Sequence, residues 1–223
     1  MVLNYSTRIW GLLLTSPPCY NPDPVNMDER EVRSKRQREV SLVGSATERR
    51  IMQILAEDDK IRNECIIGHG PSQSVKTKTF TLRDFQTGES VELPHSILSI
   101  KYTRETGEEV YMYMDADIII YHKPSRRVVC VISSKKSFRE RGAQSAYWAL
   151  KKEDRDYKYI LVTPDNDNEL FKPNRPHAQG KWRTILENEM DAVFVIDKGP
   201  PFKSRDFYVG NEYLKNYVRG LLR

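Results

Sequence analysis

Short hydrophobic runs separated by polar turns fill the second half of this 223-residue chain. The runs are rich in β-branched and aromatic residues, which is typical of strands that are buried on both faces. Between the runs lie stretches whose apolar residues recur at helical spacing. The pattern predicts strands at 110–114, 117–121, 128–133, 159–163 and 192–196, a short edge strand at 207–209, and helices at 138–152, 182–190 and 212–222.

Strands that alternate with helices predict an α/β (α+β) fold, with a mixed central β-sheet and helices packed on it. A turn at Lys123-Pro-Ser-Arg126 separates the second and third strands, because proline presets the backbone there. The strand at 117–121 is either separate from the strand at 110–114 or its continuation. In the helix at 138–152, spacing predicts that the buried face carries Ala143, Ala146, Tyr147 and Leu150.

The first half of the chain gives weaker signals. Ser45-Ala-Thr-Glu48 matches a capping box, and three aliphatic residues follow on one face, so we expect a helix from Ser45 to about residue 56. Residues 68–74 predict a loop, and 80–100 an irregular or short-strand region. We therefore expect a single domain, with an arm and a basic segment over 1–44, a core over about 45–197, and a C-terminal strand and helix over 198–223.

Composition narrows the class of protein further. Aromatic residues make up 10% of the chain, which argues against disorder, and the net charge of +5 is only a weak indication of a polyanionic partner. Three cysteines without a Cys-x-x-Cys pair exclude a disulfide framework and a cysteine-rich zinc module, and favour a reducing cytoplasm. No apolar run approaches 18 residues, so we expect no membrane span.

The candidate chemistry lies where two of these strands meet. Asp117 begins one strand and Lys135 follows the next, so a hairpin would bring the two side chains together at one sheet edge. A carboxylate there can hold a hard divalent cation, and an ammonium can stabilise developing phosphate charge. A surface ion pair is the alternative interpretation. Past Lys135, the triplet 139–141 (Arg-Glu-Arg) opens a helix and could read G·C pairs in a DNA major groove, or could simply be a solvated helix start.

An aspartate on one strand, a strand ending in x-x-Lys and then a helix together resemble the PD-(D/E)XK nuclease fold. Ser133-x-Lys135 followed by Arg139-Glu140-Arg141 resembles more narrowly the type II restriction endonucleases that read CC and GG, as in CCGG or CCNGG. The resemblance implies a Mg²⁺-dependent enzyme that cleaves double-stranded DNA as a homodimer in the cytoplasm, at a site that a DNA methyltransferase also recognises. It matches Asp117 to the metal-binding aspartate, Lys135 to the catalytic lysine and 139–141 to the base-reading element, with Asp115 as a rival for the aspartate.

Two departures from that pattern concern the second metal ligand. Position 133, where the family usually has an acid, is Ser133, and the glutamate that the resembled group places thirteen residues after the lysine is Trp148 here. The candidate replacements are Gln144, one turn earlier on that helix, and Glu48, unless Glu48 only completes the capping box. The missing acids support one alternative, a non-catalytic DNA-binding protein on a nuclease scaffold. A repair or recombination nuclease of the same fold is a further alternative.

Overall fold

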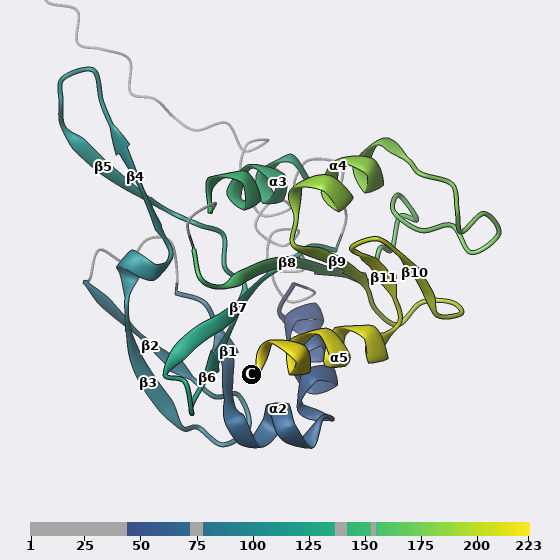
Figure 1. Ribbon diagram of the computed structural model, residues 1–223, viewed down its shortest axis with the longest axis horizontal. Helices are drawn as coiled ribbons and strands as arrows, with labels where there is room; N and C mark the ends of the chain where they lie inside the picture. The colour runs from purple at the N-terminus through teal and green to yellow at the C-terminus, as the bar shows by residue number, and fades with distance from the viewer. Residues whose placement is uncertain (1–43, 72–77, 137–141, 153–154) are drawn as a thin grey trace, which may run out of the picture. The chain divides into compact units, whose positions relative to one another are not determined.

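A mixed β-sheet runs through the centre of the computed structural model, which describes residues 44–71, 78–136, 142–152 and 155–223 (Figure 1). Its inner strands are parallel, from β7 through β8 and β9 to β11, and its outer pairs are antiparallel. The predicted mixed sheet is therefore confirmed. In spatial order its strands are β1 (Cys65–His69), β6 (Ile118–His122), β7 (Arg127–Ser134), β8 (Lys158–Thr163), β9 (Ala192–Val195), β11 (Phe207–Val209) and β10 (Phe202–Ser204).

Helices cover both faces of this sheet. On one face lie α3 (Gly142–Lys151) and α4 (Lys181–Glu189), and on the other lie the helix over 44–56 and α5 (Asn211–Leu221) (Figure 1). Successive residues of the inner strands enter opposite cores, and these two-sided contacts explain why their sequences are almost continuously apolar. A short helix, α2 (Asp59–Glu64), leads into β1.

Two hairpins lie outside the central sheet. The first pairs β2 (Thr79–Arg83) with β3 (Ser90–Pro94), and the second pairs β4 (Ser99–Thr103) with β5 (Glu109–Tyr113), which projects away from the sheet (Figure 1). The predicted short strands within 80–100 are thus confirmed, with a single 3-10 turn at His95–Ile97 between the hairpins. Since β5 belongs to a separate ribbon, the strand at 117–121 is not its continuation.

The predicted buried face of the helix at 138–152 is confirmed for Ala146, which is buried, and is wrong for Ala143, Tyr147 and Leu150. Tyr147 and Leu150 are 39% and 48% exposed, whereas Ser145 and Trp148 are buried. The buried face of this helix combines small side chains with Trp148, whereas Tyr147 and Leu150 lie outside. Tyr147 instead meets Tyr102 of the β4–β5 ribbon through their hydroxyl groups.

Three smaller expectations also need correction. Residue 44 is already helical, so Ser45 lies inside its helix and is not the N-cap of a capping box. The predicted loop over 68–74 begins too early, because Gly68 belongs to β1. The strand at 207–209 is not at the edge, since β10 lies beyond it.

The described residues all belong to one compact unit, Ser41–Arg223. Within them, no helix has the length and apolar character that a membrane crossing needs. The proline-containing arm and the basic segment of the sequence lie almost entirely outside the described residues.

Candidate active site

The β6–β7 hairpin brings the two predicted site residues together. Its register pairs Ile118 with Ile132, and the Asp117 backbone N–H donates to the carbonyl of Ile132 at 3.0 Å. Asp117 therefore lies beside the carboxyl end of β7, from which Lys135 follows directly. The Lys135 backbone N–H donates to the carbonyl of Val162 on β8 at 3.3 Å, which fixes the end of β7 against the next strand.

Three charged side chains meet at this edge of the sheet. The Lys135 Nζ lies 2.7 Å from Asp115 Oδ2 and 2.9 Å from Asp117 Oδ2. The lysine side chain is only 4% exposed, whereas each aspartate is 20% exposed. We call Asp115, Asp117 and Lys135 the Asp–Lys cluster. Two carboxylates facing one ammonium leave one negative charge without a partner inside the cluster.

The surroundings shift the proton affinities of the cluster. Burial raises the pKa of the Asp117 carboxyl, and the neighbouring Asp115 adds to the increase, although Lys135 and a 2.6 Å hydrogen bond from the Ser134 N–H oppose it. Burial lowers the pKa of the Lys135 amine, but the charges of Asp117 and Asp115 outweigh burial and raise that pKa above its usual range. Lys135 is therefore held as an ammonium.

Ser133, which occupies the position of the usual acid, faces α3 and not solvent. Its Oγ shares a 3.1 Å hydrogen bond with the Oγ of Ser145, and both residues are fully buried. On the same helix Gln144 is exposed, and Trp148 is packed in the core. The residue that α3 presents to β7 is thus Ser145, which no pattern in the sequence indicated.

Glu48 reaches the same region of the sheet edge from the opposite face. Its carboxylate lies 3.0 Å from Nδ1 of His69, the last residue of β1. The hydrogen bond to Glu48 raises the pKa of the His69 imidazole, and the charge of Asp117 contributes to the same shift. Glu48 is therefore already engaged by a histidine that lies within electrostatic range of the Asp–Lys cluster.

A glycine packs against the link that carries both aspartates. The Gly70 N–H donates to the carbonyl of Asp117 at 3.1 Å. A Cβ atom added to Gly70 would lie 1.8 Å from the carbonyl oxygen of Ala116, the residue between the two aspartates. The close approach of the two backbones at this point requires glycine.

The chemistry of the cluster fits a small divalent cation. Mg²⁺ commonly takes one or two carboxylates and completes its coordination with water and substrate phosphate oxygens. Asp115 and Asp117 supply two partly exposed carboxylates with an unpaired negative charge. No group of three or more His, Cys, Asp or Glu side chains suited to a metal occurs in the part of the chain that the structure describes, so at least some ligands would come from water or substrate. Arg139, Glu140 and Arg141 lie outside the described residues.

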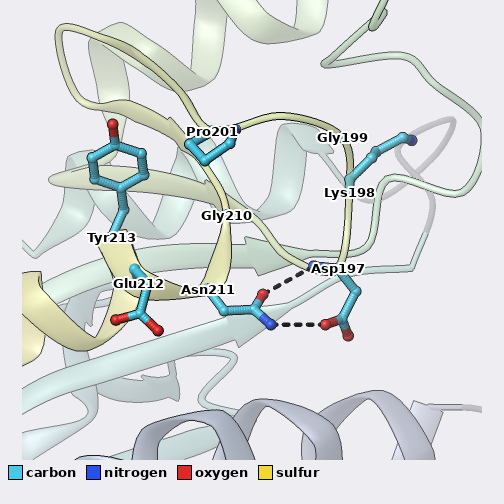
Figure 2. A pocket seen from close by; sticks show the side chains of 8 residues that line it. All are labelled: Asp197, Lys198, Gly199, Pro201, Gly210, Asn211, Glu212 and Tyr213. Atoms are coloured by element: carbon cyan, nitrogen blue, oxygen red, sulfur yellow. Dashed lines mark hydrogen bonds between the residues drawn. The ribbon is translucent and has the colours of Figure 1, made fainter.

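A separate pocket lies where β9 meets the start of α5 (Figure 2). The Asn211 side chain accepts a hydrogen bond from the Asp197 N–H at 3.0 Å and donates to Asp197 Oδ1 at 2.9 Å. Arg50 pairs with the same carboxylate at 2.8 Å, and the Lys198 ammonium contacts Asp165. Because these polar groups hold one another, we assign the pocket a structural role.

Comparisons with known proteins place the Asp–Lys cluster inside a matched region. The model of the family described as BsaWI restriction endonuclease type 2 matches residues 90–211, which is more than half of the chain. A protein named "Putative type II restriction enzyme MjaVIP" from Methanocaldococcus jannaschii is 32% identical over 111 residues, covering 47% of this chain and 49% of its own length.

A second relative gives a consistent result over a shorter region. The "Probable type II restriction enzyme HpyAORF263P" of Helicobacter pylori is 36% identical over 66 residues, covering 27% of this chain and 34% of that protein. The matches thus span half or less of the length of these relatives. The resemblance to type II restriction endonucleases is confirmed at the level of the family, and the chain belongs to the BsaWI restriction endonuclease type 2 family.

Proposed function

We propose that this protein is a Mg²⁺-dependent, site-specific endonuclease that hydrolyses phosphodiester bonds in double-stranded DNA. The observation that carries the proposal is the Asp–Lys cluster, which lies at the carboxyl end of a parallel strand and within the region that the family model matches. Carboxyl ends of strands are where open α/β sheets usually bind their ligands.

In this proposal Asp117 is the metal-binding aspartate and Lys135 the catalytic lysine, with Ser133 in the position of the usual acid. A bound Mg²⁺ would supply charge that acidifies a water ligand and neutralises the phosphate. The buried Lys135 ammonium holds its positive charge beside the reacting phosphate, where little solvent screens it. Attack of the water oxygen forms one P–O bond and breaks another, and the leaving oxygen takes up a proton.

The proposed DNA site follows from the resemblance. Arg139 and Arg141 would bind guanines and Glu140 would accept from cytosine, giving a palindrome that contains CC and GG. A homodimer would match this two-fold symmetry, with each subunit cutting one strand, and a DNA methyltransferase acting on the same site would protect the host. We further propose a cytoplasmic enzyme with one nuclease domain, whose core spans about 45–197 between the arm (1–44) and the C-terminal segment (198–223).

A cleavage assay on plasmid DNA tests the proposed activity. We expect discrete fragments with Mg²⁺ and none without it, and no fragments from Asp117→Ala or Lys135→Ala, although both variants should retain specific DNA binding. Asp206→Ala, which removes an exposed acid on the turn between β10 and β11, serves as the matched control and should cleave normally. Full activity in either cluster variant would reject the assignment of these residues.

The second candidate function is DNA binding without cleavage. The specific observation in its favour concerns two positions that usually carry acids. Ser133, where the nuclease fold usually has an acid, and Trp148, where the resembled group has a glutamate, are both buried away from solvent. Specific DNA binding by the wild-type protein with no cleavage in Mg²⁺ or Mn²⁺ would establish this alternative. Cleavage that follows DNA structure and not sequence would instead indicate a repair or recombination nuclease.

Base recognition is tested with Arg139→Ala and Arg141→Ala. Each bidentate arginine–guanine contact contributes about 1–3 kcal/mol of discrimination, so specific affinity should fall at least roughly tenfold. Non-specific affinity should be nearly unchanged because phosphate contacts remain. An equal fall in specific and non-specific affinity would show that these arginines contact phosphates only, and a mapped site without adjacent G·C pairs in each half would show that the triplet does not read them.

A further inference from the structure

We infer that Asp115 is the second carboxylate ligand of the metal site, in place of the acid that related nucleases carry where this chain has Ser133. The inference rests on the proposed function, since it concerns the Mg²⁺ that this function requires. It makes the D-A-D sequence at 115–117 a single two-carboxylate unit. Three observations support it.

The first observation is that Ser133 is committed elsewhere. Its hydroxyl is fully buried between β7 and α3, where it bonds to Ser145 at 3.1 Å. A hydroxyl so enclosed has neither the charge of a carboxylate nor access to an ion at the open edge. The position that usually supplies the second acid therefore contributes to helix packing in this chain.

The second observation is that Asp115 is fixed in place although it lies in the link between β5 and β6. The hydroxyl of Tyr159 on β8 donates to the Asp115 carbonyl at 2.9 Å, and Tyr159 is fully buried. The Asp115 side chain then contacts the same Lys135 Nζ as Asp117 does. Tyr159 therefore positions the backbone of Asp115, and Lys135 holds its carboxylate beside that of Asp117.

The third observation concerns the rival ligands. Gln144 is exposed and neutral, and it neighbours the residue that actually faces β7. Glu48 is held by His69 at 3.0 Å. Asp115 is therefore the acid that already lies beside Asp117, and the surplus negative charge of these two carboxylates over Lys135 attracts a cation without a third acid.

Binding of Mn²⁺ to the full-length protein without DNA tests the inference. The amplitude of the free-Mn²⁺ signal in electron paramagnetic resonance measures the affinity, so the readout does not depend on cleavage. Asp115→Asn should weaken Mn²⁺ binding by at least roughly tenfold, and Asp117→Asn should do the same, because even groups outside the ligand shell alter metal affinity by about 10–100-fold. Asp206→Asn makes the same change of charge at an exposed turn, and it should bind Mn²⁺ like the wild type, as should Gln144→Ala.

A crystal structure of the wild-type protein with Mn²⁺ separates direct ligation from a general effect of charge and needs no variant to fold. We expect an anomalous peak within about 2.6 Å of a carboxylate oxygen of both Asp115 and Asp117. Wild-type affinity in Asp115→Asn, or an ion bound to Asp117 with Glu48 or Gln144 while Asp115 points away, would overturn the inference.

The proposed function fails in a different way. If Mn²⁺ binds through both aspartates but the wild-type protein cuts no DNA with any divalent ion, the metal site stands and the nuclease activity does not. If the wild-type protein cuts DNA while Asp115→Asn binds Mn²⁺ normally, the activity stands and the role of Asp115 is rejected.

Discussion

Two charged clusters lie at opposite ends of the parallel strands. One contains two aspartates and one lysine, and the other contains one aspartate and two lysines. At the carboxyl end of β7, the Asp–Lys cluster sets two aspartates around one lysine. At the amino ends of β8 and β9, Asp191 contacts two lysines, Lys152 and Lys158, and also accepts the Tyr159 N–H at 2.7 Å. We call Asp191, Lys152 and Lys158 the Asp191 cluster.

The proton affinities of the two clusters shift in opposite directions. Burial raises the pKa of the Asp117 carboxyl and Asp115 reinforces this change. Burial also acts to raise the pKa of the Asp191 carboxyl, but the contacts with Lys152, the Tyr159 N–H and Lys158 outweigh it and lower that pKa. Both oxygens of Asp191 are taken by donors within the chain, which makes it a clamp between α3, β8 and β9. We conclude that two features separate a binding site from a structural ion pair. In a binding site the carboxylates outnumber the ammonium groups, and some of their oxygens accept no hydrogen bond from the protein.

Replacing one lysine in each cluster tests whether the two clusters differ in function, and we expect the largest effect here. Lys135→Met should lower the single-turnover rate of DNA cleavage by about 10²–10³-fold or more, because it removes a positioned charge from the reaction. Lys152→Met makes the same substitution at a lysine whose side chain is largely, though less deeply, buried and should leave that rate within about threefold wherever the variant is folded. Comparable losses in the two variants would mean that the clusters do not differ in function.

Stability should respond in the reverse order. Asp191→Asn should lower the free energy of unfolding by about 2–3 kcal/mol, because two lysines and a backbone N–H lose a charged acceptor in a largely buried place. Asp117→Asn should cost less, since Asp115 still neutralises Lys135 and a buried charge is removed. Urea denaturation measures both values, and a larger cost for Asp117→Asn would contradict the assignment of Asp191 as the structural cluster.

A smaller effect is expected in the pH dependence of the stability that Asp191 contributes. Because the pKa of Asp191 is lowered in the folded protein, its contribution to stability is present above the unfolded pKa of about 3.9 and is lost as pH falls through the folded value. The difference in melting temperature between wild type and Asp191→Asn should therefore be full near pH 6 and should shrink below about pH 4.5. A constant difference down to pH 3 would show that the carboxylate charge is not what stabilises the clamp.

The sheet could be predicted from sequence because its inner strands are buried on both faces and leave continuous apolar runs. The pairing of Asp117 with Lys135 could also be predicted, since a proline-containing turn between two such runs sets a hairpin. The orientation of α3 could not, because its buried face combines Ser145 and other small residues with Trp148, while Tyr147 and Leu150 remain outside. The contacts of Asp115 could not be predicted either. They depend on Tyr159, which lies on β8, and on the segment between β5 and β6, whose sequence has no periodic pattern.

The glycine beside the two aspartates has a consequence for how this protein tolerates change. Gly70 has no side chain and contacts Asp117 only through a backbone hydrogen bond, yet any side chain at position 70 would collide with the Ala116 carbonyl and displace the residues on either side of it. When a library randomised at position 70 is selected for DNA cleavage, almost all active variants should carry glycine. A library randomised at the exposed Gly107 should yield many active residues, because a side chain there meets no neighbouring atom and the left-handed backbone of this turn can adjust. The smallest residue near the site would then be as intolerant of replacement as the charged residues that it packs against.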